Sequence, residues 1–197
     1  MIFTQHWLSW LLFFGIIGVL VYTLKTIDEE EDLVDEEHQV FGIGNFQLRV
    51  PNWWTDNLTS STAQTISFER TDTTYEWFAE FTWFLKANIP AGGLDDFLRQ
   101  NMELEGMEFD LNEVTLTENA SYPNAEKFQD GTYQLYRIEG TATQNKTKRC
   151  YVDAFLLEDL KNGEVLYGKS WSSILNGMLE GPYFEKALFH IIQNNPA

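Results

Sequence analysis

The chain has a single cysteine, Cys150, among its 197 residues. One cysteine cannot form an intramolecular disulfide, and it cannot supply a zinc site built from cysteines. Basic residues are also scarce, with 13 Lys and Arg against 30 Asp and Glu and a formal net charge of −17. Because a nucleic-acid-binding surface needs clustered Lys and Arg to neutralise phosphates, we expect no nucleic acid partner.

Recognisable catalytic motifs are equally sparse. The three histidines, His6, His38 and His190, have no metal-ligand spacing, and no G-x-S-x-G motif is present. Cys150 shares a strand face with Val152, Ala154 and Leu156, which indicates a buried structural thiol rather than a nucleophile. We therefore expect no enzyme activity, no catalytic residue, no metal and no cofactor. An enzyme whose acidic residues pair across a cleft stays open as an alternative, since sequence cannot locate such a pair.

One segment matches a nucleotide-binding pattern. Residues 163–170, GEVLYGKS, fit the P-loop consensus G-x-x-x-x-G-K-[ST]. Its four middle residues are bulky and strand-forming, and only 27 residues follow Ser170, too few for the rest of a nucleotide-binding sheet. We interpret the segment as one strand of a hairpin with Lys169 on its surface, and we expect no nucleotide partner.

An apolar run near the N-terminus stands apart from the rest. Residues 7–24, WLSWLLFFGIIGVLVYTL, carry no charge, and as a helix they would rise about 27 Å. We predict a transmembrane anchor over residues 1–27, with Trp7, Trp10 and Tyr22 as interfacial aromatics in the lipid bilayer. A buried soluble helix or a cleaved signal peptide is the alternative, although the flanking residues lack signal-peptide features.

The predicted transmembrane anchor also implies where the globular part of the protein lies. We expect a single-pass membrane protein whose globular part is extracytoplasmic, in the periplasm. Lys25, the basic side chain nearest the apolar run, taken alone favours the opposite orientation.

A short acidic stretch follows. Residues 28–37 read DEEEDLVDEE, with eight carboxylates and no base. Such blocks repel themselves and stay solvated, so we predict an acidic linker over residues 28–38 that acts as a spacer. The alternatives are a docking strip for a basic partner surface and loose divalent-cation binding.

Residues 39–197 show the patterns of one globular α+β domain. Apolar residues alternate with a period of two where strands are expected, and they recur at helical spacing in two segments. Strands joined by short turns, with helices inserted singly, predict an antiparallel sheet flanked by helices. The expected strands are 46–51, 65–70, 75–85, 113–117, 133–143, 150–157 and 164–169, and the helices begin near residues 94 and 184.

Two adjacent tryptophans, Trp53 and Trp54, follow Pro51 directly. Neighbouring side chains of an extended chain point to opposite faces, so both indoles cannot point into the core. An exposed tryptophan beside a sheet edge is a typical anchor of a protein interface. We therefore name Trp53 and Trp54 as the candidate interface residues.

The pattern F-x-L-x-V-P-x-x-W at residues 46–54, followed by an I-x-F strand, resembles the start of PsbP/Mog1-like domains. A mid-chain helix, a long hairpin with Gly131 and Gly140, and a closing amphipathic helix also resemble that group over residues 39–195. The resemblance implies an α/β/α sandwich on an antiparallel sheet. It also implies an accessory, chaperone or assembly role without shared catalytic residues.

Together these observations predict a membrane-anchored, non-catalytic accessory or assembly protein. We expect it to act by contact with a membrane protein or a larger membrane complex. A binding module for a small ligand or an envelope polymer, using exposed tryptophans, is the alternative from another class.

Overall fold

The structure, a computed structural model, describes residues 7, 10–23, 25, 38–70, 76–89, 93–110, 115–118 and 132–194. The chain divides into two units, Met1–His38 and Gln39–Ala197, and each is described by itself. Apart from His38, the acidic linker lies outside the described residues.

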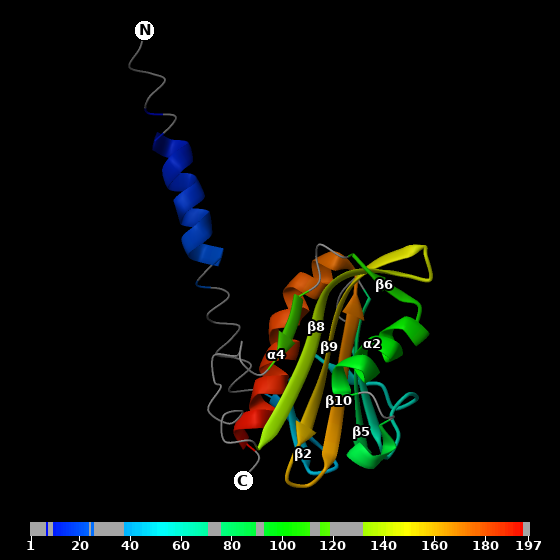
Figure 1. Cartoon of the computed structure of the whole chain (residues 1–197). Coiled ribbons are helices and arrows are strands. Elements are labelled where there is room, and N and C mark those ends of the chain that lie inside the picture. Colours follow the sequence, from blue (N-terminus) through cyan, green and yellow to red (C-terminus); the bar gives the residue numbers. More distant parts are fainter. Residues whose placement is uncertain are drawn as a thin grey trace. The chain divides into compact units, whose positions relative to one another are not determined.

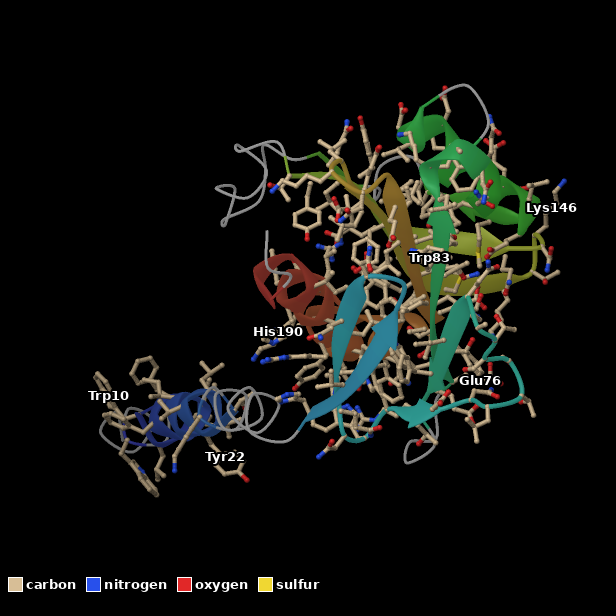
Figure 2. All side chains as sticks on the ribbon, turned by 90° about the horizontal axis from the view of Figure 1, so that it is seen from below. Trp10, Tyr22, Glu76, Trp83, Lys146 and His190 are labelled. Carbon is tan, nitrogen blue, oxygen red and sulfur yellow. The ribbon has the colours of Figure 1, made fainter. Side chains whose placement is uncertain are left out.

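The first unit contains a helical stretch over residues 10–23, whose side chains are exposed. Figure 2 shows Trp10 and Tyr22 on this stretch, and Trp7 precedes it with 55% of its surface exposed. No helix among the described residues has both the length and the apolar character that a membrane span requires. The predicted single-pass membrane location with an extracytoplasmic domain is therefore wrong, and the transmembrane anchor is not supported.

The second unit is built on an antiparallel sheet of eight strands among its described residues. Their order across the sheet is β3-β4-β5-β10-β9-β8-β6, and β7 also pairs with β8. The strands are β3 (Thr55–Asp56), β4 (Thr65–Glu69), β5 (Trp77–Leu85), β6 (Met107–Phe109), β7 (Thr115–Glu118), β8 (Tyr133–Gln144), β9 (Lys148–Asp159) and β10 (Glu164–Ser172).

Helices cover both faces of this sheet (Figure 1). Helix α4 (Ile174–Asn194) and the separate hairpin of β1 (His38–Ile43) and β2 (Phe46–Pro51) pack on the first face. Helix α2 (Leu94–Leu104) packs on the second face. The prediction of an α+β fold with an antiparallel sheet flanked by helices is confirmed.

Strand β5 shows how the sequence pattern produces the two faces. Trp77, Ala79 and Phe81 are at most 1% exposed and belong to the first-face core. Because side chains alternate along a strand, Phe78 points to the second face, where it stacks on Trp171. Tyr75, also assigned to this strand from the sequence, lies outside the described residues.

Helix α4 begins ten residues earlier than the sequence pattern indicates, and it includes Gly177 and Pro182. Gly177 permits a close approach to the sheet, because an added Cβ there would lie 2.4 Å from side-chain atoms of Tyr151. Phe184 and Leu188 are fully buried, as the predicted amphipathic stripe requires.

The β1–β2 hairpin is fastened to the sheet at its turn. Gly44 has a φ of 55°, and a Cβ at that position would lie 2.1 Å from the indole nitrogen of Trp83. The Glu164 carboxylate accepts hydrogen bonds from the Asn45 backbone N–H (3.1 Å) and from Trp83 Nε1 (2.8 Å). Figure 2 labels Trp83, a residue of β5.

Candidate functional site

The tryptophan pair lies in a turn after β2. The backbone N–H of Trp54 donates to the Pro51 carbonyl at 3.1 Å, which closes a turn directly after the strand. Trp54 is 0% exposed and packs on Trp77, with ring centroids 4.3 Å apart. Trp53 is half-buried, and its ring meets Tyr183 of α4 edge to face at 5.1 Å.

A buried carboxylate on α4 joins the two indoles. Glu180 is 1% exposed, and its Oε2 accepts hydrogen bonds from Trp54 Nε1 at 3.0 Å and from Trp53 Nε1 at 3.5 Å. The Arg70 guanidinium forms an ion pair with Glu180 Oε1 and lies 5.9 Å from the centroid of the Trp53 ring. Three donors from two segments therefore hold this carboxylate, which we call the Glu180 latch (Glu180, Trp53, Trp54 and Arg70).

The latch changes how the tryptophan pair is interpreted. Trp54 has no exposed surface, so it supports the fold and cannot contact a partner in this conformation. Trp53 is partly exposed, and its hydrogen bond to Glu180 restrains the orientation of its indole. Only Trp53 can therefore serve as a surface contact.

Beside Trp53, α4 presents large apolar side chains to solvent. Leu175 and Leu179 are 64% and 65% exposed, and Pro182 is exposed as well. Leu175, Leu179 and Tyr183 are four residues apart, so they follow one edge of the helix toward Trp53. We call Trp53, Leu175, Leu179, Pro182 and Tyr183 the α4 surface. The sequence analysis missed its leucines, although their spacing of four residues was a visible signal.

The P-loop-like segment has no phosphate-binding loop. Its residues from Glu164 onward form β10, with Gly163 in the turn before it, so the interpretation as a hairpin strand is confirmed. The surface position expected for Lys169 is wrong, because this side chain is 8% exposed. Alternation places it on the second face, where its ammonium lies 2.8 Å from Glu105 Oε1 and 4.8 Å from the centroid of the Trp171 ring.

A second ionic cluster lies between the sheet and α4. Arg137 donates two hydrogen bonds to Asp153, at 2.8 and 2.7 Å, and also pairs with Glu139 and Glu185. Burial raises the pKa of Asp153 to about 6, and the carboxylates of Glu139 and Glu185 add to the rise while Arg137 opposes it. Burial also raises the pKa of the neighbouring Tyr151 to about 12. Because every charged side chain in this cluster is paired, we interpret the cluster as a structural contact between the sheet and α4.

The remaining candidates for chemistry are the thiol of Cys150 and a metal-binding group of side chains. Cys150 is 1% exposed, and burial raises the pKa of its thiol, which lowers its thiolate fraction. Its predicted buried position beside Val152 and Ala154 is confirmed. Among the residues that the structure describes, no group of three or more His, Cys, Asp or Glu side chains is placed to hold a metal ion.

No protein-family model matches the chain, and no curated protein matches it in sequence. Among solved structures, it is similar to the Ran-binding protein Mog1p of Saccharomyces cerevisiae, with 9% identity, a TM-score of 0.47, and coverage of 81% of this chain and 92% of Mog1p. A mutant of Mog1 matches with the same identity, TM-score and coverage of this chain, and with 93% of its own length. PA94, a protein of unknown function from Pseudomonas aeruginosa, matches with 13% identity, a TM-score of 0.43, and coverage of 77% and 94% respectively. These neighbours include the Mog1 group that the sequence resembles.

Proposed function

We propose that residues 39–197 form a protein-interaction module that acts by contact and not by catalytic turnover. The α4 surface is its contact site, with Trp53 as the aromatic anchor. The observation that carries the proposal is the exposure of Leu175 and Leu179, which have 64% and 65% of their surface accessible to solvent. Both lie on α4, the helix whose Glu180 accepts a hydrogen bond from Trp53.

The two leucines supply the driving force for association. Burying a leucine side chain that was exposed contributes about 1.5–3 kcal/mol. Single exposed leucines are ordinary on protein surfaces, whereas large apolar residues gathered beside an aromatic ring are typical of interfaces. Another side of α4, with Phe184, Ala187, Leu188 and Ile191, is buried in the first-face core, so the exposed edge is presented on a well-anchored helix.

The latch makes Trp53 suitable as an anchor. Its indole N–H donates a hydrogen bond to Glu180, and its ring contacts both Arg70 and Tyr183. A partner that covers Trp53 does not have to immobilise it, so little side-chain entropy is lost on binding. Interface tryptophans of this kind commonly contribute more than about 2 kcal/mol.

The charge of the chain indicates the chemistry of the partner. With a net charge of −17, the chain attracts a surface on which apolar residues are rimmed by Lys and Arg, and it repels acidic proteins. We expect association to be faster at low ionic strength, because salt screens this long-range attraction.

Affinity capture with matched variants tests the proposal. The double change Leu175→Ser and Leu179→Ser should weaken partner binding roughly 100-fold, which corresponds to about 3 kcal/mol. Leu58→Ser and Leu104→Ser are the controls, because these leucines are 79% and 86% exposed on other parts of the domain. Equal recovery of the same partner by all variants would contradict the proposed contact site.

A further inference from the structure

The sequence contains two Asn-Gly pairs, Asn162-Gly163 and Asn176-Gly177. Asparagine followed by glycine is especially open to spontaneous deamidation, because glycine has no Cβ to shield its backbone nitrogen and adopts many conformations. That nitrogen attacks Cγ of the asparagine side chain, so the rate depends on whether the fold lets the two atoms meet. The structure places the two pairs in opposite surroundings.

Asn162 lies in the turn that joins β9 to β10, two neighbouring strands in the middle of the sheet (Figure 1). It is exposed, and Gly163 follows it with a φ of 65°. Beyond the chain neighbours of Gly163, no atom of the described residues lies within 4 Å of the position that a Cβ would take there. This side of the turn therefore has room for water and for a ring that joins the two residues.

Asn176, by contrast, lies in α4 and is 4% exposed. The Gly177 N–H donates to the Ser173 carbonyl at 2.9 Å, and a Cβ at Gly177 would lie 2.4 Å from side-chain atoms of Tyr151. The helical hydrogen bond and the close packing therefore keep the Gly177 nitrogen from turning toward Cγ of Asn176. The chain thus contains the same dipeptide in an open turn and in a packed helix, and the second serves as an internal control for the first.

One residue holds both reacting groups of the exposed pair. Asp159 is 5% exposed, and its Oδ2 accepts a hydrogen bond from Nδ2 of Asn162 at 2.7 Å. Its Oδ1 accepts from the backbone N–H groups of Lys161 (2.9 Å) and Asn162 (3.1 Å). Its backbone carbonyl accepts from the Gly163 N–H at 2.8 Å. The side-chain amide and the attacking nitrogen are therefore both bonded to Asp159, and both bonds must open before a ring can close.

We propose that Asn162 is a site of spontaneous deamidation and that Asp159 sets its rate. When the turn opens, the Gly163 nitrogen loses its proton and forms a bond to Cγ of Asn162, while the Cγ–Nδ2 bond breaks and ammonia leaves. Water then adds to either carbonyl of the resulting succinimide, which gives aspartate or isoaspartate at this position. The reaction consumes one water, releases one ammonia and needs no oxidant and no enzyme. It does not rest on the proposed function, because none of its residues belongs to the α4 surface.

The product weakens the turn in which it forms. Either product carries a carboxylate where the Asn162 amide donated to Asp159, so a donor is lost and two like charges meet. Isoaspartate also lengthens the backbone by one carbon in a turn whose strands pair from Asp159 opposite Glu164. We expect the deamidated fraction, separated by anion exchange, to have a Tm about 2–4 °C below that of the unmodified chain. An equal Tm would contradict the role assigned to the Asn162–Asp159 hydrogen bond.

Peptide mapping by mass spectrometry tests the proposal on the full chain. The chain is incubated at neutral pH in water enriched in heavy oxygen, which labels each new carboxylate. In the folded chain we expect Asn162 to convert at least roughly tenfold faster than Asn176, because a turn opens locally whereas Asn176 reacts only when α4 unfolds. In concentrated urea, where neither pair is held by the fold, the two residues should convert at similar rates. Equal conversion of both residues in the folded chain, including none at either, would overturn the proposal.

Asp159→Asn tests the control of the rate. The variant keeps one side-chain oxygen for the backbone N–H groups of the turn, but it presents an amide N–H₂ to the Asn162 amide. We expect Asn162 to deamidate about three- to tenfold faster, because a charge-assisted hydrogen bond no longer holds the reacting amide. Glu103→Gln, at an exposed position of α2, should leave the rate unchanged. An unchanged rate in folded Asp159→Asn would refute the role of Asp159, and if this variant fails to fold, the comparison of Asn162 with Asn176 in the parent chain still decides the proposal.

Discussion

Replacing Glu180 by glutamine should loosen the attachment of α4 to the sheet. The carboxylate accepts hydrogen bonds from Trp53 and Trp54 and forms an ion pair with Arg70, all at a position that is 1% exposed. Glutamine has nearly the same volume but one acceptor oxygen, no charge and an amide N–H₂ that faces donors. At least one donor therefore loses its partner, and the guanidinium loses its counter-charge.

The magnitude follows from these contacts. Breaking a buried ion pair by removing one partner costs about 3–5 kcal/mol. Arg70 keeps 24% of its side chain exposed, so water recovers part of its solvation and we lower the figure to about 2–4 kcal/mol. For a chain of this length, such a loss lowers the Tm by about 5–15 °C.

Urea unfolding and thermal unfolding of the full chain measure this change, with Glu103→Gln on the exposed side of α2 as the control. A double-mutant cycle with Trp54→Phe, which keeps an aromatic side chain but removes the indole N–H and part of the ring system, cancels the packing loss and should give a coupling between this indole and the carboxylate of about 1–2 kcal/mol. If Glu180→Gln costs no more than the control, or if the coupling is zero, the latch does not hold α4.

Three further predictions concern buried positions. Gly177→Ala should destabilise the fold by about 1–3 kcal/mol in urea despite the better helix propensity of alanine, because its Cβ would clash with Tyr151; an increase in stability would contradict the packing. Asp153 has a folded-state pKa of about 6 against an ordinary value of 3.8, so it makes the free energy of unfolding fall as the pH rises from about 4 to about 6. Asp153→Asn should remove that slope in urea titrations across this range, and an unchanged slope would refute the assignment. Lys169→Ala should cost about 1–3 kcal/mol through the lost pair with Glu105, and calorimetry should detect no ATP binding to parent or variant; ATP binding that disappears in the variant would restore the P-loop interpretation.

The elements that could be predicted from the sequence are those with long, regular periods. The alternation in β5 and the helical spacing in α2 and α4 reflect the face that each element buries. The pattern of apolar residues within one segment is therefore enough to predict such an element. Strands β3 and β6, with two and three residues, are too short to show a period, and they exist because a longer neighbour pairs with them.

The contacts of the candidate site were harder to predict from the sequence. Adjacent tryptophans indicated that the two indoles differ in environment, but their common acceptor, Glu180, lies more than 120 residues away. Such a contact follows from the tertiary fold alone. Lys169, by contrast, was misjudged although its alternation with Tyr167 and Trp171 was visible in the sequence.

The role of Trp53 and the three-part organisation into residues 1–27, 28–38 and 39–197 stay predictions. So does the choice between contact and catalysis.

Site-specific photocrosslinking in native cells tests the central claim most directly. A photoreactive phenylalanine analogue at position 179, on the exposed edge of α4, should give one dominant adduct with a protein that carries a basic surface. The same analogue at position 104, where Leu104 is also exposed, should give none. Adducts of equal pattern and yield at both positions, or none at 179, would contradict the proposal that this protein works through its α4 surface.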